Sequence, residues 1–182
     1  GKSQGPSEKM APPGPRPLEL KAAGMDSNGA KHSRREKNAG RESWTFGNFV
    51  EGPSNFLALK SAKNLPSNPG QHSPFVIHGP SGTGKTHLLE AICHSFRKRS
   101  RRGPIISMTA DQFTSQYVEA LRGGGMPSFR QKYSNIGLLA LDDIHYLAGR
   151  NSTQIELLQL IDVLLRQGCP MVFTCDKAPE QL

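Results

Sequence analysis

Residues Gly79-Pro80-Ser81-Gly82-Thr83-Gly84-Lys85-Thr86 match the spacing of a phosphate-binding loop: a glycine, four further residues, and then Gly-Lys-Thr. The apolar run 75–78 precedes this loop and predicts a short buried strand. After the loop, apolar residues recur at helical spacing, at Leu88, Leu89, Ile92 and Phe96. A loop between a strand and a helix can enclose a phosphate with backbone N–H groups, and the helix dipole adds positive charge there. The sequence therefore predicts a nucleotide site, rather than a glycine turn that only caps a helix.

Within this loop, residue chemistry assigns the roles. We expect Gly79, Gly82, Thr83 and Gly84 to form the phosphate cradle. Lys85 would contact the β- and γ-phosphates, and the Thr86 hydroxyl would bind Mg²⁺. The predicted cofactors are ATP and Mg²⁺.

Composition sets further bounds on the chain. Its 182 residues suffice for one domain with a core, and it carries a net charge of +8. That charge favours a polyanionic partner, above all nucleic acid. The three cysteines lack metal-ligand spacing and are expected to be reduced core thiols. No apolar stretch is long enough for a membrane span or signal peptide, so we expect a cytoplasmic location. Since the chain begins at Gly1 without a methionine, we expect it to be a fragment or a processed product.

Two regions differ in character. Residues 1–43 are rich in proline and lack an apolar period, and we interpret them as a disordered basic linker. Its cluster 31–35 is either a solvated tail or a contact to DNA phosphates. Residues 44–182 alternate apolar runs with helical patterns, which predicts an α/β domain with a parallel sheet.

The sequence also predicts the helix starts and the connection between the second and third strands. Ser54 is a candidate cap of one helix, and Ser152 or Thr153 of another. Thr109 with Gln112 predicts a capping box. The segment 109–133 predicts two helices, although one would suffice for a crossover.

Three acidic residues are expected at the carboxyl ends of the strands, where parallel sheets bind ligands. Asp142 and Asp143 follow the apolar run 137–141, and Asp176 follows the last strand. Adjacent carboxylates favour a nearby cation, so Asp142 is expected to bind Mg²⁺ and Asp143 to orient or deprotonate the attacking water. Asp176 is a candidate either for sensing the γ-phosphate or for capping a helix. Packing or solvent roles are expected for His78, His87 and His145.

Four segments, at 44–55, 82–89, 138–144 and 173–176, together resemble the ATPase domain of the DnaA family, the bacterial chromosomal replication initiators of the AAA+ class. The resemblance covers 44–182 and implies a P-loop NTPase with a three-layer α/β fold. It implies that Val50, Gly52 and Asn55 contact the base, that His87 extends the nucleotide-binding motif, and that Asp176 is the first sensor. The implied activity is slow hydrolysis of ATP to ADP and phosphate, which resets an assembly formed on origin DNA.

The resemblance also gives the two-helix segment a meaning, because it resembles an initiator-specific insertion. The insertion implies stacking of subunits and contact with single-stranded DNA through Val118 and Arg150. A replicative helicase or its loader is a further implied partner. The family's fifth strand, arginine finger, helical lid and duplex-binding domain would follow residue 182. We therefore expect this chain to expose the edge of its first strand, to fold poorly alone and to hydrolyse ATP negligibly.

Two alternatives stay open. One is a DnaA-like regulator or helicase-loader adaptor with the same fold. The other is a P-loop small-molecule kinase, which would need an acceptor pocket and offers no role for Asp142-Asp143 or for the two-helix segment.

Overall fold

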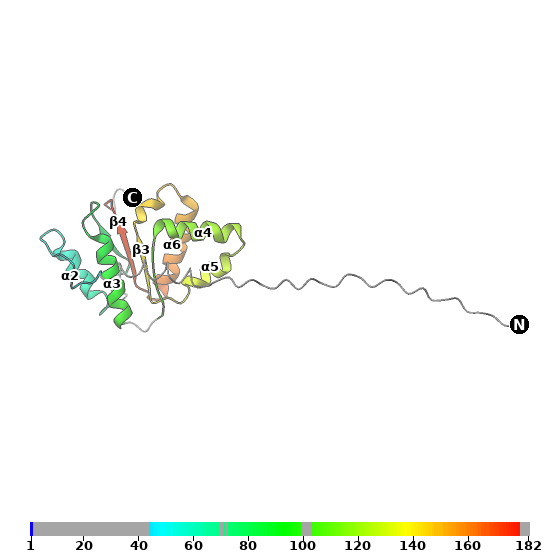
Figure 1. Cartoon of the computed structure of the whole chain (residues 1–182), viewed down its shortest axis with the longest axis horizontal. Helices are drawn as coiled ribbons and strands as arrows, with labels where there is room; N and C mark the ends of the chain where they lie inside the picture. The colour runs from blue at the N-terminus through cyan, green and yellow to red at the C-terminus, as the bar shows by residue number, and fades with distance from the viewer. Residues whose placement is uncertain (2–43, 70, 72, 100–102, 179–182) are drawn as a thin grey trace.

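The protein is described here from a computed structural model, which describes residues 44–69, 71, 73–99 and 103–178 together with Gly1 (Figure 1). The expected linker, apart from Gly1, and its basic cluster 31–35 lie outside these residues, as does the end of the chain, 179–182. No helix within the described part is both long and apolar enough to cross a membrane.

Four parallel strands form one sheet: β1 (Phe75–His78), β2 (Ile105–Thr109), β3 (Leu138–Asp142) and β4 (Met171–Cys175). Their order in the sheet is β1-β4-β3-β2, so the first two strands of the chain lie at opposite edges. This confirms the predicted parallel α/β fold. β1 pairs with β4 alone among the described strands, and Val76 on it is 38% exposed.

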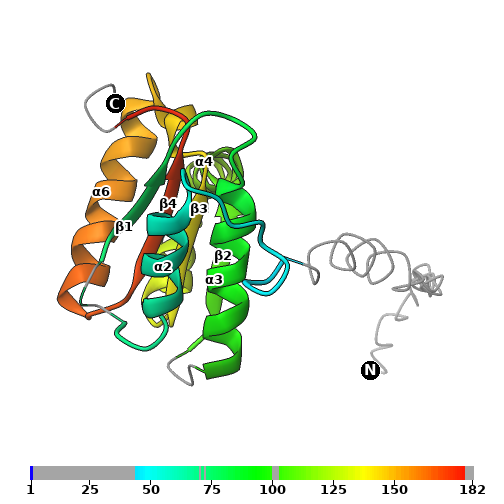
Figure 2. The same ribbon diagram turned by 90° about the vertical axis from the view of Figure 1, so that its left-hand side faces the viewer.

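Helices cover both faces of the sheet (Figures 1 and 2). On one face lie α2 (Phe56–Asn64) and α3 (Lys85–Arg99). On the other lie α4 (Ala110–Arg122), α5 (Met126–Tyr133) and α6 (Asn151–Arg166). The short 3-10 helix η1 (Ile144–Leu147) connects β3 to the loop before α6. The two predicted helices between the second and third strands are therefore present as α4 and α5.

The strand period of two divides the core between these layers. Along β3, Leu139 and Leu141 belong to the cluster under α4, α5 and α6, whereas Leu138 and Ala140 belong to the cluster under α2 and α3. Every residue of β3 and β4 is buried. Since both central strands are covered on both faces, their carboxyl ends are fixed in position, and those ends carry the acidic residues.

Some of the predicted helix caps are present in the structure, and others are not. The capping box of Thr109 and Gln112 is present at α4, as predicted. The predicted caps at Ser54 and at Ser152 or Thr153 are wrong, because α2 is preceded by Asn55 and α6 by Arg150. Thr153 lies instead inside α6 and is buried. α5 begins at Met126, one residue before Pro127, which agrees with a proline in the first turn.

Candidate nucleotide-binding site

The loop 79–84 connects the end of β1 to the first residue of α3. Gly82 and Gly84 have φ angles of 81° and 88°, in the left-handed region that glycine adopts without strain. The amide of Gly79 donates to the carbonyl of Cys175 at 3.2 Å, which ties the start of the loop to the end of β4. The Thr83 hydroxyl donates to the Pro80 carbonyl at 2.8 Å. The loop thus lies at the N-terminus of α3 with two glycines in the left-handed conformation, where the sequence predicts a phosphate site.

Lys85 is the cation of this cradle. Its ammonium donates to the Pro80 carbonyl at 2.8 Å and lies 2.7 Å from Asp176 Oδ1. The side chain of Lys85 is only 7% exposed, whereas that of Asp176 is 35% exposed. The hydrogen bond and charge of Lys85 hold the pKa of Asp176 below its ordinary value. The structure therefore joins the start of α3 to the end of β4 through Lys85 and Asp176.

The acid pair is fixed by a residue that the sequence analysis did not single out. Thr174, wholly buried in β4, donates its hydroxyl to Asp142 Oδ1 and accepts the backbone N–H of Asp143 at 2.8 Å. Asp143 has a φ of 60°, which turns the chain sharply at the end of β3. Asp142 is therefore buried at the end of β3, whereas Asp143 lies in the turn that follows and is only partly buried. Burial, and next the charge of Asp142, raise the pKa of Asp143 above its ordinary value.

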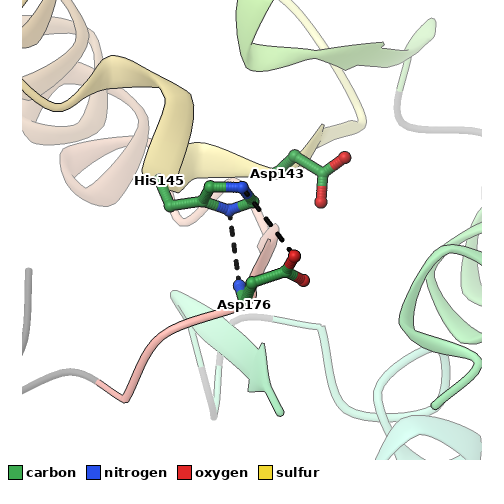
Figure 3. A group of neighbouring side chains, drawn as sticks. All are labelled: Asp143, His145 and Asp176. Carbon is green, nitrogen blue, oxygen red and sulfur yellow. Dashed lines mark hydrogen bonds and ion pairs between the residues drawn. The ribbon is translucent and has the colours of Figure 1, made fainter. Parts of the chain in front are cut away.

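His145 completes this end of the sheet (Figure 3). Its Nδ1 accepts the backbone N–H of Asp176 at 3.3 Å, and its Nε2 lies 3.9 Å from Asp176 Oδ2. One ligand atom each of Asp143, His145 and Asp176 lies within 4.8 Å of the others. The predicted role of His145 in packing or in contact with solvent missed these contacts.

The site's donors suit a magnesium ion. The charges of Asp142, Asp176 and Lys85 all act on Asp143, so three carboxylates share this end of the sheet with one lysine, which leaves an excess of negative charge for a hard cation. Thr174 occupies Asp142 Oδ1, so Oδ2 is the oxygen through which Asp142 could hold Mg²⁺ or its water. Thr86 directly follows Lys85 in α3, where its hydroxyl would be the second predicted ligand.

An aromatic segment, residues 44–52, packs against the loop. A Cβ on Gly84 would lie 3.2 Å from Phe49 Cε2, so this glycine permits the close approach. The ring of His87 stacks on Trp44 with centroids 5.9 Å apart and meets Phe49 edge-on at 5.1 Å. His87 Nε2 lies 3.1 Å from the Thr45 carbonyl and therefore carries the ring proton. His87, in the first turn of α3, thus connects the aromatic segment to the helix that follows the phosphate loop.

The three residues expected on the base side form one turn. Asn55 Oδ1 accepts the Gly52 N–H at 2.8 Å, and its amide donates to the Val50 carbonyl at 3.0 Å. The side chain of Val50 is 84% exposed, which leaves it available for contact. The base contacts themselves stay a prediction.

The two expected DNA contacts lie on the insertion and at the start of α6. Val118 on α4 is partly buried against the core and lines an open hollow with Thr114, Ser115 and Arg122. Arg150 pairs with Asp111 of α4 at 3.0 Å. The contact with Asp111 offsets part of the charge that a nucleic acid would meet.

Two positioning residues, Thr174 and His145, were missed by sequence reasoning. A hydroxyl within an otherwise apolar buried strand was the available signal for Thr174, since buried polar groups need partners. No comparable signal marked His145, because its contact depends on how η1 sits beside β4.

The fold and the site together define a P-loop NTPase domain of the AAA+ type, with a phosphate loop on the first strand and an acid pair on the third. The model of the bacterial DnaA ATPase domain matches residues 41–182. The chain therefore belongs to the DnaA family.

Individual relatives agree. The chain is 37% identical over 143 residues to the chromosomal replication initiator protein DnaA of Treponema denticola, and 37% identical over 139 residues to that of Pseudothermotoga lettingae. These matches cover 78% and 76% of the chain. The chain spans about 30% of the length of these curated relatives.

Solved structures give the same family. A replication initiator DnaA bound to AMPPCP and single-stranded DNA superposes with a TM-score of 0.72 at 36% identity, covering 76% of this chain and 43% of that one. Domain III of DnaA from Thermotoga maritima gives a TM-score of 0.73 at 32% identity, covering 76% of this chain and 58% of that one. DnaI, with a TM-score of 0.61 at 20% identity, shares the fold alone.

Proposed function

We propose that this domain binds ATP with Mg²⁺ and hydrolyses it slowly, as the switch of a DnaA-type replication initiator. The observation that carries this proposal is the contact between Lys85 and Asp176 at 2.7 Å, beside the phosphate loop. A buried lysine facing a phosphate cradle, with carboxylates across from it, suits a triphosphate and its metal. The solved DnaA complex with AMPPCP supports the choice of nucleotide.

The residues divide the chemistry. Lys85 neutralises the β- and γ-phosphates, while backbone N–H groups of the loop donate hydrogen bonds to the phosphate oxygens. Thr86 and Asp142 would hold Mg²⁺, which would supply charge neutralisation to the phosphates. Asp143 orients and deprotonates the attacking water. Asp176, released from Lys85, faces the γ-phosphate.

Base recognition is assigned to the turn of Val50, Gly52 and Asn55. This turn and His87 adjoin the aromatic segment that packs on Gly84, so a bound base would connect that segment to the phosphate loop. A shift between ATP and ADP at the loop could then be transmitted through Phe49 and His87.

The proposed partner is origin DNA. The single-stranded DNA in the solved DnaA complex supports contact through the insertion, with Val118 on α4 and Arg150 next to it. The ATP state would favour self-assembly along that strand, and a replicative helicase or its loader is a further proposed partner. The proposed place of action is the cytoplasm, where a chromosomal replication initiator meets its DNA.

The experiment that tests the proposal measures nucleotide and DNA binding together. We expect AMPPCP with Mg²⁺ to bind the protein, and single-stranded DNA to bind more tightly in its presence than with ADP. Binding of AMPPCP without any effect on the affinity for DNA would favour the alternative of a regulator or loader adaptor. DnaI shares this fold. Phosphoryl transfer to a nucleoside or metabolite would instead identify a kinase.

A further inference from the structure

His145 lies in η1, two residues after the Asp143 turn, with its side chain 14% exposed. Both of its ring nitrogens face Asp176 (Figure 3). Its ring also lies against that of Tyr146, with centroids 4.4 Å apart. We propose that His145 is a positioning residue for hydrolysis: it holds the end of β4 through the Asp176 backbone and receives the Asp176 carboxylate when Lys85 turns to phosphate. This inference rests on the proposed ATPase function.

The backbone contact fixes the tautomer of the ring. The N–H of Asp176 can only donate, so His145 Nδ1 must offer a lone pair to it across 3.3 Å. A neutral imidazole with an unprotonated Nδ1 carries its proton on Nε2. That Nε2–H is therefore directed to the same side as the Asp176 carboxylate, which is an acceptor.

The carboxylate of Asp176 stands between two donors. Its Oδ1 lies 2.7 Å from the Lys85 ammonium, whereas its Oδ2 lies 3.9 Å from His145 Nε2. The first distance is that of a charge-assisted hydrogen bond, and the second is too long for a hydrogen bond. The ion pair therefore draws the carboxylate toward Lys85.

Binding of a triphosphate changes this balance. The γ-phosphate competes for the Lys85 ammonium and repels the Asp176 carboxylate, which weakens the Lys85–Asp176 pair. A shift of about 1 Å would bring Asp176 Oδ2 within hydrogen-bonding distance of His145 Nε2. His145 thereby fixes where Asp176 lies during hydrolysis, and the backbone contact keeps the strand end in place throughout.

Three variants of His145 separate these contacts. H145F keeps the ring and its packing on Tyr146 but removes both nitrogens. H145N places an amide oxygen where Nδ1 lies and so keeps the acceptor for the Asp176 backbone. H145Q can place a donor near Nε2 but lacks the acceptor at Nδ1.

The test measures the affinity for ATP and the single-turnover hydrolysis rate in the full-length protein. We expect H145F to hydrolyse ATP about tenfold more slowly, because small misplacements of catalytic groups are costly, with ATP affinity unchanged within about threefold. H145N, which keeps only the acceptor for the Asp176 backbone, and H145Q, which keeps only the donor near Nε2, are each expected to restore part of the rate. A normal rate in H145F, or an equal loss in H145N and H145F, would overturn the inference.

A second readout needs no hydrolysis. Long-range ¹⁵N–¹H correlation of the His145 ring in the nucleotide-free protein is expected to show a proton on Nε2 and none on Nδ1. A proton on Nδ1 would overturn the inference even if ATP binds and is hydrolysed. A protein that shows the expected tautomer but binds no ATP would instead overturn the proposed function, and with it the catalytic role of His145.

Discussion

Lys85 and Asp176, 91 positions apart in the sequence, meet at 2.7 Å where the first residue of α3 faces the carboxyl end of β4. The contact depends on β4 lying beside β1, because only this order puts the two ends together. The same strand carries Thr174, which holds the acid pair. β4 is therefore the element that connects the phosphate loop to the carboxylates.

We expect K85A to abolish measurable ATP binding. The variant removes the one buried ammonium at the cradle and a set of charge-assisted hydrogen bonds, which together contribute about 3 kcal/mol, or roughly a hundredfold in affinity. Titration with a fluorescent ATP analogue measures the effect. K98A, on the exposed end of α3, is the matched control and should bind normally. Unchanged binding in K85A would remove the nucleotide site from this loop.

D143N is expected to abolish hydrolysis, keep ATP binding and stabilise the nucleotide-free fold at neutral pH. Burial and the Asp142 charge raise the pKa of Asp143 above 3.8, so the folded state disfavours the charged form. The stabilising contribution of Asp143 is then full below the unfolded pKa, near 4, and is lost as pH rises through the raised folded pKa. Asparagine cannot ionise, and it tolerates the left-handed backbone at this position.

The measurement for D143N is the free energy of unfolding against pH, without nucleotide or Mg²⁺. The free energy of unfolding of D143N, relative to that of the natural protein, should increase as pH rises from about 3 to about 7. D162N, which alters an exposed carboxylate on α6, is the matched control. A D143N variant that loses stability relative to the natural protein over this range would contradict the assigned pKa direction.

T174V is expected to destabilise the fold and weaken Mg²⁺-dependent nucleotide binding. Valine matches threonine in shape, but it leaves the Asp143 N–H and Asp142 Oδ1 without their bridging hydroxyl. The expected cost is about 1–3 kcal/mol, measured by chemical denaturation. T174S should recover most of it, since the hydroxyl is kept.

A matched control for T174V exists within α4. The Thr114 hydroxyl donates to the Ala110 carbonyl of its own helix at 2.9 Å, and that carbonyl keeps its backbone partner in a helix. T114V should therefore cost less than T174V. Equal losses in the free energy of unfolding for the two substitutions would show that the Thr174 hydroxyl does not stabilise the acid pair.

The sequence was sufficient for the features that depend on local pattern. The phosphate loop, the two helices before β3 and the capping box at Thr109 are all read from residues within a few positions of one another. The parallel fold follows from the alternation of strands and helices. Asp142 and Asp143 were placed correctly at a strand end because the apolar run before them is continuous.

What the sequence could not give were contacts set by strand register and by loop position. Thr174 reaches Asp142 because Leu141 and Phe173 are register partners on neighbouring strands. His145 reaches Asp176 because η1 folds back beside β4. The Arg150–Asp111 pair likewise joins α4 to the loop before α6. The caps predicted for α2 and α6 were wrong for a different reason, since several polar residues near each of these two helix starts could serve as the cap.

Trp44 should report nucleotide binding by its fluorescence. It is the single tryptophan of the chain, and it stacks on His87, the residue after the phosphate-loop threonine. Phe49 of the same segment lies against Gly84, so a shift of the loop on binding phosphate is transmitted to the indole through two contacts. We expect AMPPCP with Mg²⁺ to change the Trp44 emission in a saturable manner, and K85A to abolish the change. H87A should alter the starting emission and reduce the response, because the stacked ring is removed. An emission unchanged at saturating nucleotide would show that the aromatic segment is independent of the phosphate loop.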